Sequence, residues 1–259
     1  ALGANTTGAS NVAVGSCALL CNISGAENTA VGMNAGRLTT GGANVAVGHS
    51  ALEDNTSGAS NTALGREALH TNTTASNNVA VGKRALYLNT TGATNTAVGQ
   101  NSLHSNTTAS DNTAVGAGSL YANLTGASNV AIGRQALAAN TASNNTAIGY
   151  HSLLQNTTGN SNTAVGQCSL ETNVSGVSNV AVGLQALRQN TASDNVAIGT
   201  QALLVNTSGT KNVAVGKSSL AANTTADNNT SIGWESLKAN TTGASNTALG
   251  KSALAANTE

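Results

Sequence analysis

Apolar and polar residues follow one another in a block of about seventeen residues that recurs along the whole chain. Residues 95–99 (NTAVG) show its opening: Asn, a Thr or Val, Ala, a branched aliphatic residue and Gly. An Ala or Ser followed by Leu comes next, as at 102–103, and a polar stretch such as 106–111 closes the block. Short β-branched runs bounded by Gly, Asn, Thr and Ser predict strands, and the block is too short for two helices with their turns.

Self-similarity at a fixed period is typical of a solenoid, in which each unit packs only on its neighbours. The pattern therefore predicts an all-β fold, a parallel β-solenoid (β-roll) of about 17 residues per coil and about 15 coils, as one repeat domain over residues 1–259. In the coil above we expect a strand at 95–99, a second strand at 102–103 and a corner at 106–111. We expect one Val and one Leu per coil, with small residues, to fill a thin interior.

An asparagine stands four residues before the glycine of every block, without exception. Identical amides one strand spacing apart can donate to and accept from one another, so this column predicts a buried hydrogen-bonded ladder. The alternative is an asparagine that is simply favoured by a turn. The members of this inner asparagine column are Asn11, Asn28, Asn44, Asn61, Asn78, Asn95, Asn112, Asn129, Asn145, Asn162, Asn179, Asn195, Asn212, Asn229 and Asn246.

Neither face of the predicted strand carries a charged residue in any block. Because a lone thin solenoid buries only its inner face, we expect the outer face, assigned here to Asn, Ala and Gly, to meet another copy in a closed homo-oligomer. The alternative is a flat, uncharged exterior. The chain opens within a block and has no polar capping unit at either end, which predicts head-to-tail filament growth or a piece of a longer shaft.

Composition narrows the classes of partner. Charged residues are 8% of the chain and balance to a net charge of zero, which argues against nucleic acid and against an anionic membrane surface. No apolar stretch approaches the roughly 20 residues of a membrane span, so membrane insertion is not expected.

Catalytic and metal-binding patterns do not emerge from the residue spacing. The histidines are scattered, and even His70 and His104, which share a position in the block, stand two coils apart. Cys17 and Cys168 share another position nine coils apart, so free or intermolecular thiols are expected, with a Cys17–Cys21 bridge as the alternative. We therefore predict no enzymatic activity, no cofactor and no metal site.

A second asparagine column lies at the corner and mostly matches the N-x-S/T glycosylation pattern. Asn140, Asn190 and Asn257 keep the asparagine where the Ser or Thr is lost, which favours a second ladder or an Asx turn over glycosylation. The corner residues that match the pattern are Asn5, Asn22, Asn55, Asn72, Asn89, Asn106, Asn123, Asn156, Asn173, Asn206, Asn223 and Asn240.

The blocks NTAVG-x-x-A/S-L-x-x-NTTG resemble the repeats of bacterial and phage surface proteins of the tail-fibre-domain type. They are more distantly similar to the head repeats of trimeric autotransporter adhesins. The adhesin likeness implies a left-handed parallel β-roll, three chains side by side and an extracellular role in attachment. The blocks here are longer than typical adhesin head repeats, and the chain shows no coiled-coil stalk or membrane anchor.

Together these patterns predict a structural segment of an extracellular fibre or shaft, at a cell surface or on a virion. It would self-associate, either laterally as a homo-oligomer such as a trimer or head to tail as a filament, and act as a spacer or an adhesive surface for an unknown receptor. The alternative is a repetitive-surface binder such as an ice-binding solenoid, suggested by an interrupted threonine row that comprises Thr73, Thr90, Thr107, Thr207, Thr224 and Thr241.

Overall fold

The computed structural model describes residues 1–259 and contains fifteen three-residue strands and no helix. It therefore has no helix that is long and apolar enough to cross a bilayer. The strands are β1 (Val12–Val14), β2 (Thr29–Val31), β3 (Val45–Val47), β4 (Thr62–Leu64), β5 (Val79–Val81), β6 (Thr96–Val98), β7 (Thr113–Val115), β8 (Val130–Ile132), β9 (Thr146–Ile148), β10 (Thr163–Val165), β11 (Val180–Val182), β12 (Val196–Ile198), β13 (Val213–Val215), β14 (Thr230–Ile232) and β15 (Thr247–Leu249).

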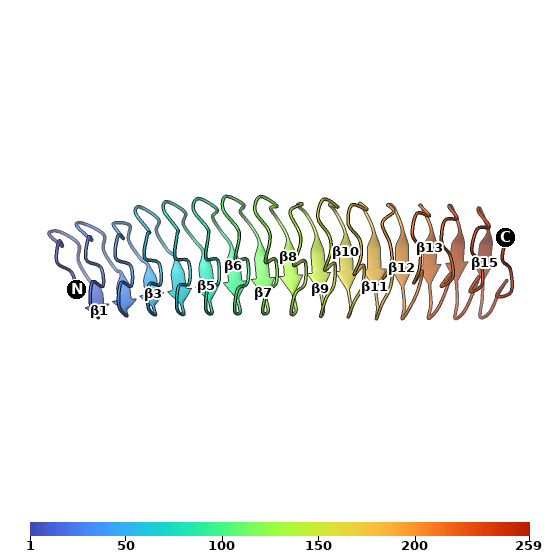
Figure 1. Cartoon of the computed structure of the whole chain (residues 1–259), viewed down its shortest axis with the longest axis horizontal. Coiled ribbons are helices and arrows are strands. Elements are labelled where there is room, and N and C mark those ends of the chain that lie inside the picture. The colour runs from blue at the N-terminus through green and yellow to red at the C-terminus, as the bar shows by residue number, and fades with distance from the viewer. The chain divides into compact units, whose positions relative to one another are not determined.

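The chain divides into two compact units, Ala1–Asn129 with β1 to β7 and Val130–Glu259 with β8 to β15. Within each unit consecutive strands pair in parallel and in sequence order, one strand per coil (Figure 1). The register places equivalent residues side by side, as for Ala97 and Ala114 of β6 and β7. The predicted all-β parallel solenoid is thus confirmed, with coils about 17 residues apart. Its description as a single domain stays a prediction.

The strands bury their alanine and expose their branched residues. Ala97, Ala147 and Ala197 are fully buried, whereas Ile148 of β9 and Ile198 of β12 are 38% and 41% exposed. The expectation that Val fills the interior while Asn, Ala and Gly face outward is therefore wrong. The inner asparagine must face the interior to reach its neighbours, and the two-residue strand period then turns Ala inward and Thr/Val and Val/Ile/Leu outward.

Leucine is the one large apolar side chain that each regular coil buries. Leu103, for example, is fully buried, yet its backbone lies in the left-handed region at φ 51°. The predicted second strand at 102–103 is therefore wrong: the segment is a turn in which the Ser102 N–H donates to the Gly99 carbonyl at 3.3 Å. The Leu103 N–H still donates to Ser119 of the next coil at 2.9 Å, so coil-to-coil bonding continues without strand geometry.

The glycine column marks the closest approach between coils. Gly82 has φ 128°, and a Cβ built there would lie 2.7 Å from the carbonyl carbon of Gly99 in the next coil. A side chain is therefore excluded both by backbone conformation and by contact with the neighbouring backbone. This explains why the position directly after each strand accepts only glycine.

Candidate functional sites

The inner asparagine column lies inside the stack, buried from Asn28 to Asn229. The Asn95 N–H donates to Asn78 Oδ1 at 2.9 Å, and Asn95 Oδ1 accepts the N–H of Asn112 at 3.0 Å. Asn95 Nδ2 donates to the carbonyl of Ala109 at 2.9 Å. Most steps of this column thus join a side-chain amide to neighbouring backbone. The amides contact one another directly at some steps, such as Asn61 Nδ2 to Asn44 Oδ1 at 3.2 Å.

The corner asparagine column, seven residues after each glycine, forms the more direct amide-to-amide ladder. Asn89 Nδ2 donates to Asn72 Oδ1 at 2.9 Å, and Asn106 Nδ2 donates to Asn89 Oδ1 at 2.8 Å. Each Nδ2 also donates to a carbonyl of its own corner, as Asn89 does to Gly92 at 2.9 Å. The sequence offered a ladder and an Asx turn as alternatives, and the corner amides bond in both ways.

Burial of the corner amides bears on the glycosylation pattern. Every corner asparagine from Asn55 to Asn240 is fully buried. A sugar attaches to Nδ2, and this atom already donates to the neighbouring amide and to a carbonyl of its own corner, as in Asn72. Attachment would replace one of these two N–H donors and would place a sugar at a fully buried atom, so this geometry argues against the sugar-coated rod.

The corner ladder is interrupted once, in the coil that carries β2. Thr39 stands where the other coils have Asn, and its buried Oγ1 has no hydrogen-bond partner. In the preceding coil the buried Oδ1 of Asn22 also lacks a donor. A buried polar atom without a partner costs about 1 to 3 kcal/mol, which makes this the weakest step of the ladder in the first unit.

The outer strand face is the main candidate interaction surface in each unit. It comprises the first and third residues of every strand, a row of Thr or Val beside a row of Val, Ile or Leu. No charged residue occupies either row in any coil. Its aliphatic side chains remain substantially exposed, with Leu64 at 46% and Ile148 at 38%.

Charged side chains gather in the turns, where they pair between neighbouring coils. Arg37 Nε contacts Glu53 Oε1 at 2.9 Å, and Arg188 Nε contacts Glu171 Oε2 at 2.7 Å. Burial raises the pKa of Glu53, but hydrogen bonds from Ser50 and Arg37 outweigh burial and hold that pKa below its usual range. These pairs lie apart from the uncharged outer strand face.

Two of the histidines belong to an aromatic stack that sequence reasoning missed. The rings of His70, Tyr87, His104 and Tyr121 follow one another at centroid distances of 5.3, 5.3 and 5.0 Å. Burial, with a smaller contribution from Arg84, lowers the pKa of His104. The two histidines do stand two coils apart, but Tyr87 at the same position of the intervening coil connects them.

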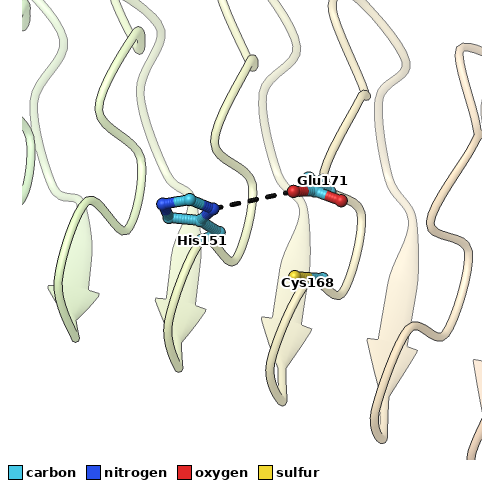
Figure 2. A group of neighbouring side chains, drawn as sticks. All are labelled: His151, Cys168 and Glu171. Carbon is cyan, nitrogen blue, oxygen red and sulfur yellow. Dashed lines mark ion pairs between the residues drawn. The ribbon is translucent and has the colours of Figure 1, made fainter.

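All three cysteines are free, so the alternative Cys17–Cys21 bridge is not formed. Cys168 is buried, and its neighbourhood contains His151 and Glu171 (Figure 2). The ligand atoms of these three residues lie within 4.8 Å of one another. His151 and Cys168 hold the same position in successive blocks, a relation that comparing histidines only with histidines and cysteines only with cysteines does not show.

The threonine row that suggested ice binding uses its hydroxyl groups within the corner. Thr73 Oγ1 donates to the carbonyl of Thr90 at 3.0 Å, and Thr90 Oγ1 donates to Thr107 at 3.0 Å. Thr207 and Thr224 repeat this bond to the next coil. Because these hydroxyl groups already donate to backbone carbonyls, their protons are not free to bond to ice. The threonine row therefore supports ice binding less than the sequence alone suggests.

Comparison with protein-family models and with curated proteins finds no match for this chain.

Proposed function

We propose that the chain is a structural segment of an extracellular fibre or shaft that associates side by side with further copies of itself. The observation that carries this proposal is the uncharged outer strand face, with aliphatic side chains such as Ile198 left 41% exposed. An exposed apolar surface that repeats without interruption is typical of an interaction surface.

A second copy suits this face because its chemistry repeats at the strand spacing. Two such faces have the same interval between rows, about 4.8 Å, so branched side chains of one copy can pack between those of the other in every coil. The absence of charge from both rows means that no ionic group loses water when the faces meet. The sequence-based proposal of lateral association is thus kept, with Thr/Val and Val/Ile/Leu replacing Asn, Ala and Gly as the contact residues.

The variable turns fit a spacer or adhesive role. Charges and rings such as Arg84, Tyr121 and Trp234 lie outside the two strand rows, so side-by-side packing leaves them available to a receptor. We place the segment on a cell surface or a virion because its blocks resemble the repeats of bacterial and phage surface proteins. Closed trimers and head-to-tail filaments are the two forms of assembly to be distinguished.

Sedimentation velocity across a wide concentration range tests this function. We expect the parent chain to associate and the double variant Ile148→Lys, Ile198→Lys to remain monomeric, because each lysine must desolvate its charge in the contact. The control variant Gln100→Lys, Gln167→Lys adds the same charge at exposed turn positions and should associate like the parent. A parent chain that stays monomeric at every concentration would contradict the proposal, and electron micrographs would separate spikes from filaments.

A further inference from the structure

We propose that His151, Cys168 and Glu171 form a binding site for a transition-metal ion, with Zn²⁺ as the best-matched ion. His151 belongs to the turn after β9, and Cys168 and Glu171 belong to the turn after β10. The site is therefore assembled by stacking two coils of the second unit, and neither coil contains it alone. It is independent of the proposed lateral association, because none of its residues lies on the outer strand face.

The backbone brings the imidazole and the thiol together. His151 and Cys168 occupy the second position after the glycine in successive coils, and both adopt a left-handed backbone, with φ 56° and 55°. The Cys168 N–H donates to the carbonyl of Tyr150 at 2.9 Å, which fixes the two turns against each other. Equivalent side chains in this column stand about one strand spacing apart.

The three ligand atoms are close enough for one ion. His151 Nδ1 lies 3.7 Å from Glu171 Oε1, and all three ligand atoms fall within 4.8 Å of one another (Figure 2). Around a tetrahedral zinc with bonds of about 2.0 to 2.3 Å, neighbouring ligand atoms stand roughly 3.3 to 3.7 Å apart. The longest separation, at most 4.8 Å, would have to shorten by about 1.1 to 1.5 Å to complete the triangle.

The remaining atoms of His151 and Glu171 already have partners that aim the ligand atoms inward. His151 Nε2 lies 2.8 Å from Gln135 Oε1, a pure acceptor, so Nε2 carries the ring proton and Nδ1 keeps its lone pair. Glu171 Oε2 accepts from Arg188 Nε at 2.7 Å, which leaves Oε1 toward His151. A ligating histidine that donates its other N–H to an oxygen acceptor is the usual arrangement around protein-bound zinc.

The donor set selects the class of ion. A thiolate and an imidazole favour Zn²⁺ and related ions over Mg²⁺ or Ca²⁺, which prefer oxygen ligands. On binding, the Cys168 S–H bond breaks, sulfur bonds to the metal and the proton passes to solvent. Three protein ligands leave a fourth position for water or for a group from a partner molecule. The site is partly accessible, with the His151 and Glu171 side chains 20% and 13% exposed.

Cobalt(II) titration of the full chain tests the site, because thiolate-bound cobalt absorbs in the near ultraviolet. We expect one Co²⁺ per chain, displaced by Zn²⁺, and a rise in melting temperature with Zn²⁺. Cys168→Ser should abolish the absorption band, and His151→Gln and Glu171→Ala should each weaken binding at least about tenfold. These substitutions suit the fold, since Ser218, Gln185 and Ala221 hold the equivalent positions in other coils.

Two control variants address adventitious binding. Cys17→Ser changes the other cysteine of the same column, whose neighbouring coil offers Asn34 in place of histidine, and His49→Ala removes an exposed histidine. Both should bind Co²⁺ like the parent. The proposal is overturned if the parent binds no Co²⁺, if Cys17→Ser removes the band while Cys168→Ser keeps it, or if His151→Gln and Glu171→Ala bind as tightly as the parent.

Discussion

Two coils that are each one residue shorter than the regular repeat differ in the hydrogen bonding of their buried corner residue. The coil from Gly183 to Gly199 keeps its corner asparagine: Asn190 Nδ2 donates to Ala192 at 2.7 Å, and Oδ1 accepts from Asn206 at 2.8 Å. The coil from Gly32 to Gly48 has Thr39 there instead, with unpaired buried atoms on Thr39 and Asn22. A coil that is one residue shorter can therefore keep its corner hydrogen bonds, as Asn190 does. The unpaired buried atoms arise where Thr39 replaces the asparagine.

Substitution of the column glycine should destabilise both coils to a similar degree, because the missing residues lie in the corners, away from the glycines. A Cβ at Gly183 would stand 2.7 Å from the carbonyl carbon of Gly199, and one at Gly32 would stand 2.5 Å from the Gly48 oxygen. Chemical denaturation should show that Gly183→Ala and Gly32→Ala each lose about 2 to 6 kcal/mol of stability, from backbone strain and overpacking together. Gly250→Ala, which has the same type of backbone but nothing within 4 Å, should lose less. Equal losses at all three positions would show that contact between coils is unimportant there.

The two short coils also differ at the leucine position. Gly36 replaces the leucine in the first coil, whereas Leu187 of the second is fully buried. Leu187→Ala should reduce the free energy of unfolding by about 2 to 5 kcal/mol, through lost burial and the cavity left behind. Leu184→Ala in the same coil removes a side chain that is 43% exposed and should have a small effect in the same urea titration. Comparable losses for the two variants would refute the single-leucine interior.

Copying the threonine of the first coil into the second should reproduce its defect. Asn190→Thr removes the acceptor of Asn206 Nδ2 and the donor to Asn173 Oδ1. We expect a loss of about 1 to 3 kcal/mol in the free energy of unfolding, measured by thermal or urea denaturation. A neutral result would mean that the corner amides do not stabilise the stack.

The reverse change should repair the first coil. Thr39→Asn supplies a donor for the unpaired Asn22 Oδ1 and extends the ladder between Asn22 and Asn55, with an expected gain of about 1 kcal/mol. Ala43→Asn places the same amide at an exposed position of the same corner, where Asn77 and Asn228 stand in other coils, and serves as the control. A destabilised Thr39→Asn variant alongside a neutral control would count against the ladder.

The smallest expected change in stability comes from the ion pairs in the turns of both coils. The folded chain holds the pKa of Glu53 below its usual range, so this carboxylate adds stability above its unfolded pKa and loses it as the pH falls through the folded pKa. Arg37→Ala should cost less than about 1 kcal/mol at neutral pH. The difference from the parent should shrink in acid, as followed by melting temperature against pH. A difference that grows in acid would contradict the sign.

The repeat period and the parallel solenoid could be predicted because every block repeats the same apolar spacing. Which side of the strand points into the interior could not be predicted, because both sides of the NTAVG segment are uncharged. The hydrogen bonds of Asn95 decide between the two orientations. The second strand failed because Leu103 adopts a left-handed backbone that its residue type disfavours. The His151 cluster required comparison of different residue types at one position of successive blocks.

Side-chain amide hydrogen exchange, followed by NMR, tests the buried columns most directly. The Nδ2 groups of Asn89 and Asn106 are buried and donate to the amide of the preceding coil and to a carbonyl of their own corner, whereas Asn160 is exposed in another corner. We predict that Asn89 and Asn106 exchange orders of magnitude more slowly than Asn160, at rates that approach those of global unfolding. Exchange of all three at the rate of a free amide would contradict a solenoid held together by asparagine.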